Sequence, residues 1–279
     1  MARVEELSLK SFNMRDICLG SNFNAVIVGK KGSGKSTIIQ DMLYYLSKSN
    51  VPRICVFSGT EIANGFFSQF VPPTFIFNGD GVELRLQSIM QNQINLGIKK
   101  NVGELDRNAD TRIVIVLDDL GFKKKLFASD VMKELFMNGR HHGIIMITAI
   151  QYVKALTPAL RTNTDVIFVM KQNDNPSKQS LYESYFGIFD KPAEFRNVLD
   201  GCTENFSSMV MDNRGAPSSH IPSHVFWYKA KCGRQFRVGG PALWAYHDRW
   251  FLSEEDRYLA QKNKKKSDRG GSVITIRKR

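Results

Sequence analysis

Residues 24–37 read NAVIVGKKGSGKST, and this stretch decides the fold. Its first five residues form a short apolar run, which is typical of a strand buried on both faces of a parallel sheet. Beyond the glycine-rich turn, residues 35–48 place apolar side chains at helical spacing, namely Ile38, Ile39, Met42, Leu43 and Leu46. The sequence therefore predicts a buried strand that leads through a tight turn directly into an amphipathic helix.

The turn, residues 29–36, matches the phosphate-binding pattern G-x-x-x-x-G-K-[ST]. Glycines let the backbone wrap tightly, so that successive N–H groups form an anion nest beside the positive end of the following helix. In such a loop Lys35 reaches the β- and γ-phosphates and the Ser36 hydroxyl ligates Mg²⁺. We therefore expect ATP and Mg²⁺ as cofactors. The residues expected around the nucleotide are Gly29, Lys30, Lys31, Gly32, Ser33, Gly34, Lys35, Ser36 and Thr37.

Two acidic residues follow the strongest strand signal in the chain. Residues 113–117, IVIVL, are wholly apolar, and Asp118 and Asp119 come directly after them. An apolar strand that delivers an acid to its carboxyl end supplies the Mg²⁺ side of a phosphate-binding loop. We expect Asp118 to hold Mg²⁺ through water and Asp119 to orient and deprotonate the attacking water. Without the upstream loop, such a pair would equally be a turn and a helix cap.

Polar residues flank the next apolar run, residues 143–150. Gln151 ends this run, where a polar side chain would sense the loss of the γ-phosphate. Arg140 precedes the run, and an arginine from a neighbouring subunit can stabilise the charge that develops on a γ-phosphate. Arg161 is a second candidate for this trans-acting arginine. Taken alone, each of these side chains has an ordinary alternative as a solvated surface residue.

The remaining periodicity predicts an α/β fold with a parallel, helix-flanked sheet. Strand candidates are residues 51–57, 74–77 and 165–170, and helix candidates are residues 84–98 and 130–138, the latter capped by Ser129 and stopped by Gly139. About 80 residues with an extra strand candidate separate the loop from the acidic pair. This spacing favours a phosphate-loop fold in which another strand lies between the two motif strands.

The pattern of alternating strand and helix candidates ends at about residue 175. Pro192 opens a short helix that Gly201 closes, and residues 206–212 and 223–230 are strand candidates. The expected organisation has four parts: an N-terminal segment 1–20, an ATPase core 21–175, a small β-rich C-terminal extension 176–260 packed on the core, and a basic tail 261–279.

The basic excess is concentrated in the tail. The chain has 39 Lys and Arg against 27 Asp and Glu, a formal net charge of +12, yet residues 262–279 alone hold eight basic side chains and one acidic one. Net charge is therefore a poor argument for nucleic-acid binding by the body of the protein. Lys123, Lys124 and Lys125, just after the acidic pair, are candidate contacts to DNA phosphates, with a solvated loop as the equal alternative.

The motifs together resemble a known superfamily. The order GKKGSGKST, IVLDD, GRHHGIIMITAIQ and LRTN is similar to the FtsK–HerA superfamily of ring ATPases, which implies a RecA-like P-loop NTPase fold. More narrowly, FSGTE at 57–61, GRHHGI and CTENF…VFWYKA within 202–230 resemble the poxvirus-type genome-packaging ATPase of large nucleo-cytoplasmic DNA viruses. This resemblance supports Arg140 as the trans-acting arginine and Gln151 as the sensor. Many relatives have glutamate where this chain has Asp119, so Glu61 is a second candidate for the base.

The resemblance covers about residues 20–232 and implies a ring, a pentamer or hexamer, that pumps double-stranded DNA into a capsid. It further implies a capsid or membrane-associated virion protein as partner and a location at virus-assembly sites in the host cytoplasm, with possible association with the virion. Two alternatives stay open: a HerA-like DNA pump in repair or transfer, and an ATP-gated assembly adaptor with little hydrolysis.

Other classes are disfavoured. No apolar run approaches the roughly 20 residues that span a bilayer, and residues 1–16 lack the apolar segment of a signal peptide, so we expect a soluble protein. Zinc is a minor alternative, because His220 and His224 have an allowed ligand spacing while Cys202 and Cys232 lack nearby cysteine partners. Buried thiols and loop histidines are the preferred interpretation.

Overall fold

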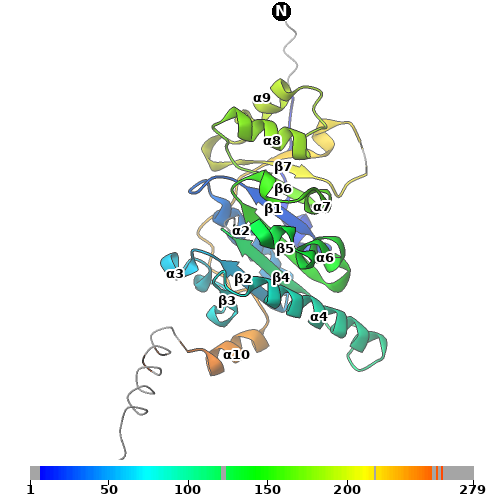
Figure 1. Ribbon diagram of the computed structural model, residues 1–279, viewed down its shortest axis with the longest axis vertical. Coiled ribbons are helices and arrows are strands. Elements are labelled where there is room, and N and C mark those ends of the chain that lie inside the picture. The colour runs from blue at the N-terminus through cyan, green and yellow to red at the C-terminus, as the bar shows by residue number, and fades with distance from the viewer. Residues whose placement is uncertain (1–6, 121–123, 217, 253–255, 257–258, 260–279) are drawn as a thin grey trace, which may run out of the picture.

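The computed structural model describes residues 7–120, 124–216, 218–252, 256 and 259, and it contains one sheet covered by helices on both faces (Figure 1). The strands are β1 (Asn24–Val28), β2 (Arg53–Ser58), β3 (Ile76–Phe77), β4 (Ile113–Asp118), β5 (Ile144–Ile150), β6 (Val166–Val169), β7 (Ser208–Asp212) and β8 (Val225–Tyr228). Lys123 and the predicted basic tail lie outside the described residues.

Helices alternate with these strands. The α-helices are α1 (Met14–Leu19), α2 (Lys35–Lys48), α3 (Glu61–Asn64), α4 (Val82–Asn101), α5 (Lys124–Ala128), α6 (Asp130–Asn138), α7 (Pro158–Thr162), α8 (Asn175–Tyr185), α9 (Pro192–Cys202) and α10 (Pro241–Trp250). The short 3₁₀ helices are η1 (Phe67–Gln69), η2 (Pro73–Phe75), η3 (Gly139–His142), η4 (Val153–Ala155), η5 (Glu204–Phe206) and η6 (Ile221–Ser223). Within the described residues, no helix is both long and apolar enough to cross a bilayer.

The sheet has the strand order β3-β2-β4-β5-β1-β6-β7-β8. All strands from β3 to β6 in this order pair in parallel, whereas β7 pairs antiparallel with β6 and β8 antiparallel with β7. β5 lies between the loop strand β1 and the acidic strand β4. The predicted α/β fold, with an extra strand between the two motif strands, is therefore confirmed. This order brings the carboxyl ends of β1, β4 and β5 to one edge of the sheet.

The central strands are apolar because each is buried on two sides. One core packs Val26 and Val28 of β1 against side chains of α4, α6, α7, α8 and α9. The other core packs Ala25 and Ile27 against α1, α2 and η1. Since successive side chains of a strand point to opposite faces, these two sets place α2 on one face and helices α4 to α9 on the other. Residues 24–28, which lack alternation of polar and apolar side chains, thus correctly predicted a sheet covered by helices on both faces.

Several element boundaries differ from the sequence predictions. Only Ile76 and Phe77 of residues 74–77 form a strand, because the two prolines before them favour the 3₁₀ turn η2. α6 matches its prediction, with Ser129 as the N-cap residue and Gly139 as the C-cap residue after Asn138; what the sequence did not predict is that the chain continues directly into η3, which ends at Gly143 with φ +77°. The predicted lysine loop is also partly wrong, because α5 begins at Lys124.

The C-terminal part is continuous with the core sheet. β7 and β8 extend the sheet beyond β6, and the N-terminal segment joins β8 through backbone hydrogen bonds of Lys10 and Phe12 with Trp227. The chain after β8 then crosses α2, where the buried Asp41 carboxylate accepts hydrogen bonds from the Tyr228 hydroxyl, the Lys231 N–H and Arg234. This segment carries α10 to the β3 side of the sheet, where the Tyr246 ring packs against that of Phe75.

Candidate functional site

Glycines shape the turn between β1 and α2. A Cβ atom at Gly29 would lie 2.5 Å from Ser33 Oγ and 2.7 Å from Met170 Cβ, so no larger residue fits there. Gly32 and Gly34 have φ of +76° and +98°, a backbone region that favours glycine. Gly34 is the N-cap residue of the 14-residue helix α2. The turn thus directs backbone N–H groups and the positive helix end to one point, as an anion site requires.

Lys35 is the charged group at this turn. Its side chain is largely buried, with 8% of the residue exposed, and Nζ donates a hydrogen bond to Lys30 O at 3.0 Å. Burial lowers the pKa of Lys35, and the nearby carboxylates of Asp118 and Asp119 act in the opposite direction. The ammonium therefore lies within electrostatic range of Asp118, the last residue of β4, and of Asp119, which follows it.

Asp118 is the last residue of β4 and is only 4% exposed. Burial raises the pKa of its carboxyl to about 6, with Lys35 opposing the rise and Asp119 and Glu61 adding to it. A buried carboxylate of this kind is costly unless a cation compensates it. Asp118 and the Ser36 hydroxyl supply the hard oxygen ligands that Mg²⁺ prefers beside substrate phosphates, so the residues present fit the ion.

Asp119 and Gln151, predicted from separate motifs, meet at the carboxyl edge of the sheet. Gln151 Nε2 donates to Asp119 Oδ1 at 2.9 Å. Asp119 has φ of +52°, a conformation that costs a non-glycine residue energy and that often marks functional sites. The amide of Gln151 thereby fixes the second acid, leaving its other carboxylate oxygen outside this hydrogen bond.

Glu61, the second candidate for the base, binds backbone N–H groups through both of its carboxylate oxygens. Its two carboxylate oxygens accept hydrogen bonds from the backbone N–H groups of Phe67 at 2.9 Å and Ser68 at 2.8 Å. These bonds cap η1 and close the turn after α3. Glu61 acts on the site through its charge, since it raises the pKa of Asp118, while Asp119 is the acid beside Gln151.

Arg140 lies at the opposite end of β5 from Gln151. It belongs to η3, before the first residue of the strand, and its guanidinium pairs with Asp165. The seven residues of β5 span about 23 Å. Arg140 is therefore out of reach of its own phosphate loop. Arg161, the alternative arginine, lies in α7 and donates from Nη1 to Leu156 O at 2.8 Å.

Two residues of the site carried no functional signal in the sequence analysis. Met170, just after β6, packs against the positions of Gly29 and Gly34. Asp174 forms an ion pair with Lys30 Nζ at 3.0 Å. Its carboxylate also caps α8 by accepting a hydrogen bond from the Ser177 N–H. The segment DNPS at 174–177 has the pattern of a helix start, with an Asp cap and Pro at the second helical position, and would have located this cap.

The structure gives little support to the predicted DNA contacts at residues 123–125 or to the zinc alternative. Lys125 is exposed in α5, and nothing is described for Lys123 or for the Lys124 side chain. Among the described residues, no three His, Cys, Asp or Glu side chains gather where a metal ion would be held. His224 Nδ1 instead pairs with Asp212 O at 3.0 Å.

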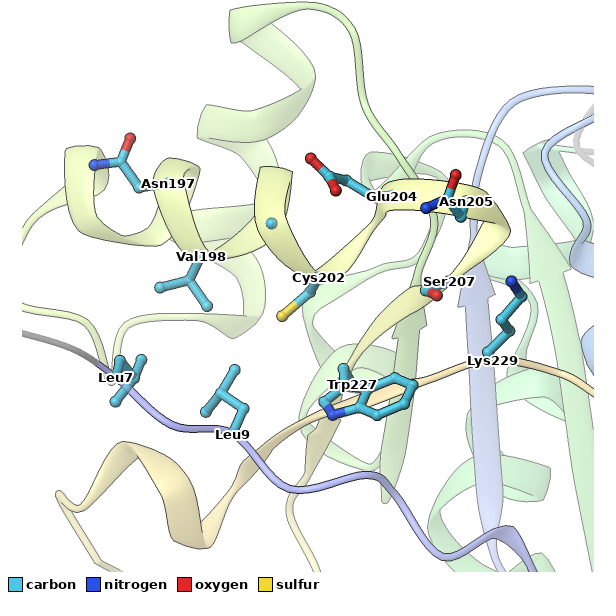
Figure 2. Close-up of a pocket in the computed structure, with 11 residues that line it drawn as sticks. Leu7, Leu9, Asn197, Val198, Cys202, Glu204, Asn205, Ser207, Trp227 and Lys229 are labelled. Carbon is cyan, nitrogen blue, oxygen red and sulfur yellow. The ribbon is translucent and has the colours of Figure 1, made fainter.

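One cavity in the described part of the chain lies beside these elements, and a larger one lies away from them. The first, of about 300 Å³, lies beside Val28 and Gln151, next to the start of α8. The larger, of about 630 Å³, lies at the far end of the sheet, where Trp227 faces Cys202 of α9 and Leu9 of the N-terminal segment (Figure 2). None of the predicted nucleotide-site residues lines the larger cavity; its lining includes Cys202, Glu204 and Trp227 of the CTENF and VFWYKA segments on which the family resemblance partly rests.

Comparisons with known proteins agree with this architecture. The family model described as Poxvirus A32 protein matches residues 10–179. An uncharacterised protein of Acanthamoeba polyphaga mimivirus is 32% identical over 236 residues, covering 84% of this chain and 82% of that protein. One of Invertebrate iridescent virus 6 is 31% identical over 237 residues, covering 82% and 88%.

Solved structures share the fold. The genome packaging NTPase from Sulfolobus turreted icosahedral virus 2, in complex with sulfate, matches with a TM-score of 0.55 at 14% identity, covering 77% of this chain and 100% of that chain. Its complex with ATP-gammaS gives 0.52 at 14% identity, covering 75% and 97%. EssC (ATPases 2 and 3) from Geobacillus thermodenitrificans gives 0.52 at 15% identity, covering 87% and 44%.

Proposed function

The chain belongs to the Poxvirus A32 protein family, and from this premise we propose that it is an ATPase that packages a viral genome by translocating double-stranded DNA. The observation that carries the proposal is the meeting of four predicted elements at one edge of the sheet. The glycine loop, the buried Lys35, the acidic pair and Gln151 all lie there. Proteins with the same fold include a genome packaging NTPase that binds ATP-gammaS.

Each group has a role that its position supports. The loop N–H groups and Lys35 hold the β- and γ-phosphates, and Ser36 and Asp118 hold Mg²⁺, which when bound neutralises charge on the phosphates. Asp119, fixed by Gln151, orients the attacking water and accepts its proton. Gln151 connects the γ-phosphate position to Asp119, so that loss of the phosphate is transmitted to β5.

A head-to-tail ring follows from the position of Arg140. The nucleotide site occupies the carboxyl edge of the sheet and Arg140 the amino edge, so one copy completes the site of the next only if unlike edges meet. Such a heterologous contact closes into a ring when its rotation allows. We place double-stranded DNA in the channel of a pentamer or hexamer, a capsid or membrane-associated virion protein as its dock, and the assembly site in the host cytoplasm as its location.

Turnover with and without DNA tests the proposal. The assembled protein is incubated with ATP, Mg²⁺ and either no DNA or linear duplex of more than about 100 base pairs. We expect duplex to raise the rate several-fold, and added salt to remove the increase because phosphate contacts are salt-sensitive. Displacement of a third strand from the same duplex reports translocation. An unchanged rate in the assembled oligomer would refute the motor, and absent single-turnover hydrolysis would favour the assembly adaptor.

The raised pKa of Asp118 predicts how Mg²⁺ use depends on pH. Its carboxyl has a pKa of about 6, so protons compete with Mg²⁺ as the pH falls through this value. Because only the ionised carboxylate holds the ion, the Mg²⁺ concentration for half-maximal ATP turnover should rise about tenfold for each pH unit below 6. Above pH 7 it should be nearly constant. A flat Mg²⁺ requirement between pH 5 and 8 would contradict this role for Asp118.

A further inference from the structure

A buried carboxylate lies beside the candidate trans-acting arginine at the amino edge of the sheet. Asp165 immediately precedes β6 and its side chain is only 12% exposed. One of its oxygens accepts a hydrogen bond from the Asn24 N–H at 2.8 Å, and the other pairs with Arg140 Nη1. Its own N–H donates to Asn24 O at 2.9 Å, so the carboxylate is fixed to the first residue of the loop strand β1.

Several groups act on the ionisation of Asp165. Burial raises the pKa of its carboxyl, whereas the Asn24 N–H and the Arg140 and Arg214 guanidiniums act to lower it. The Arg140 guanidinium therefore lies against a largely buried carboxylate that is fixed to β1. This is a more specific arrangement than a solvated surface ion pair, whose contribution is small.

The backbone of Arg140 is held as firmly as its side chain. Its carbonyl oxygen accepts hydrogen bonds from Asn22 Nδ2 at 2.9 Å and from the Gly143 N–H at 3.2 Å. Both ends of the residue are thus tied to the segment around β1, which also carries the phosphate loop. A side chain with this many rotatable bonds would otherwise lose much conformational entropy on meeting a phosphate.

Arg140 nevertheless keeps donors for a second anion. A guanidinium has five N–H groups, and within the described residues that of Arg140 makes one hydrogen bond, to Asp165. Its side chain is 34% exposed. The neighbouring Arg214 differs, because Nε and Nη2 both bind Asp212, at 2.9 and 2.7 Å. Among the described residues, the Arg140 guanidinium therefore uses one hydrogen bond to Asp165, and its other N–H groups make none.

We propose that Asp165 is the positioning residue for Arg140, holding one edge of the guanidinium so that the remaining N–H groups face the γ-phosphate bound by the neighbouring copy. This inference rests on the proposed ATPase function and extends it. Asp165 acts through Arg140 and does not touch the nucleotide. A positioned donor does not have to reorganise when charge develops on the phosphate. This preorganisation accounts for most of the stabilisation that such a donor gives to the transition state.

A double-mutant cycle on ATP turnover tests this. The proteins are the native chain, Asp165→Asn, Arg140→Ala and the double variant, each assembled with DNA and compared for kcat and KM. We expect Asp165→Asn to lower kcat by about 10–100-fold with KM changed less than about threefold, because the nucleotide site at the other edge is intact. In the Arg140→Ala background, the same substitution should lower kcat no further.

Asp110→Asn is the matched control, since it breaks the Arg112–Asp110 ion pair just before β4, at the same edge of the sheet, and should leave kcat within about twofold. Thermal melting and binding of a fluorescent ATP analogue confirm that each variant is folded. If Asp165→Asn melts below the assay temperature, Asp165→Glu replaces it: this variant keeps the charge but moves the guanidinium, and it should still lower kcat without raising KM.

The outcomes separate the two levels of the argument. If Arg140→Ala turns over ATP at the native rate, the trans-acting role of Arg140 fails. If Arg140→Ala is slow while Asp165→Asn is native, the positioning role fails and the proposed function stands. If Asp165→Asn lowers kcat equally in the presence and absence of Arg140, Asp165 is merely structural and the inference is overturned.

Discussion

Replacing Lys35 with alanine is expected to lower ATP turnover by about 10²–10³-fold, the loss typical of removing one preorganised charge donor from a transition state. The ammonium is buried beside Asp118 and Asp119 and is held by Lys30 O. Alanine removes the cation that, in the proposed function, faces the γ-phosphate. It also removes a charge that lowers the pKa of Asp118, so that this carboxyl would be protonated at higher pH and would hold Mg²⁺ less well.

Lys48→Ala provides the control for this substitution. Lys48 is the last residue of the same helix, its side chain is exposed, and Nζ lies 5.3 Å from the centre of the Tyr44 ring. Its removal should leave turnover within about twofold, since an exposed cation–π contact contributes little. Steady-state turnover and equilibrium binding of an ATP analogue are measured for both variants. Native turnover in Lys35→Ala would show that hydrolysis occurs at another site.

The parts of this site that could be predicted from sequence are those formed by residues that are contiguous in the chain. The loop at residues 29–36 and the acids after residues 113–117 are local patterns, and their surrounding strands have no polar face to confuse the periodicity. Once the sheet is parallel, the carboxyl ends of its strands share an edge. The meeting of Asp119 with Gln151, 32 residues apart, therefore follows from topology alone.

The parts that could not be predicted are pairings between distant residues with no shared pattern. Lys30 with Asp174, Arg140 with Asp165 and Asp41 with Arg234 each join separate elements, and the register that brings them together is fixed by packing of the whole sheet. Glu61 shows the converse error. Its position after β2 made it a candidate base, but its oxygens are used by two backbone N–H groups that no sequence pattern announced.

The second large effect is expected at Arg140. Arg140→Ala alone should lower turnover of the assembled protein by about 10³-fold, the lower range for a trans-acting arginine. Nucleotide binding should persist, because the loop, Lys35 and the acidic pair lie at the other edge of the sheet. The result to be measured is kcat with and without DNA, alongside binding of an ATP analogue.

Mixing two inactive variants shows whether this arginine acts in trans. Lys35→Ala lacks a working nucleotide site but keeps Arg140, and Arg140→Ala has the reverse defect. In an equal mixture, each interface draws its site and its arginine independently, so about a quarter of the interfaces combine an intact site with an intact arginine. Turnover should therefore recover to about a quarter of the native rate, if subunits exchange freely and sites act independently. Differently tagged chains and pull-down establish that mixed assemblies form. Mixed assemblies without recovered turnover would place the effect of Arg140 within its own subunit, which the 23 Å length of β5, about seven residues at 3.3 Å each, argues against.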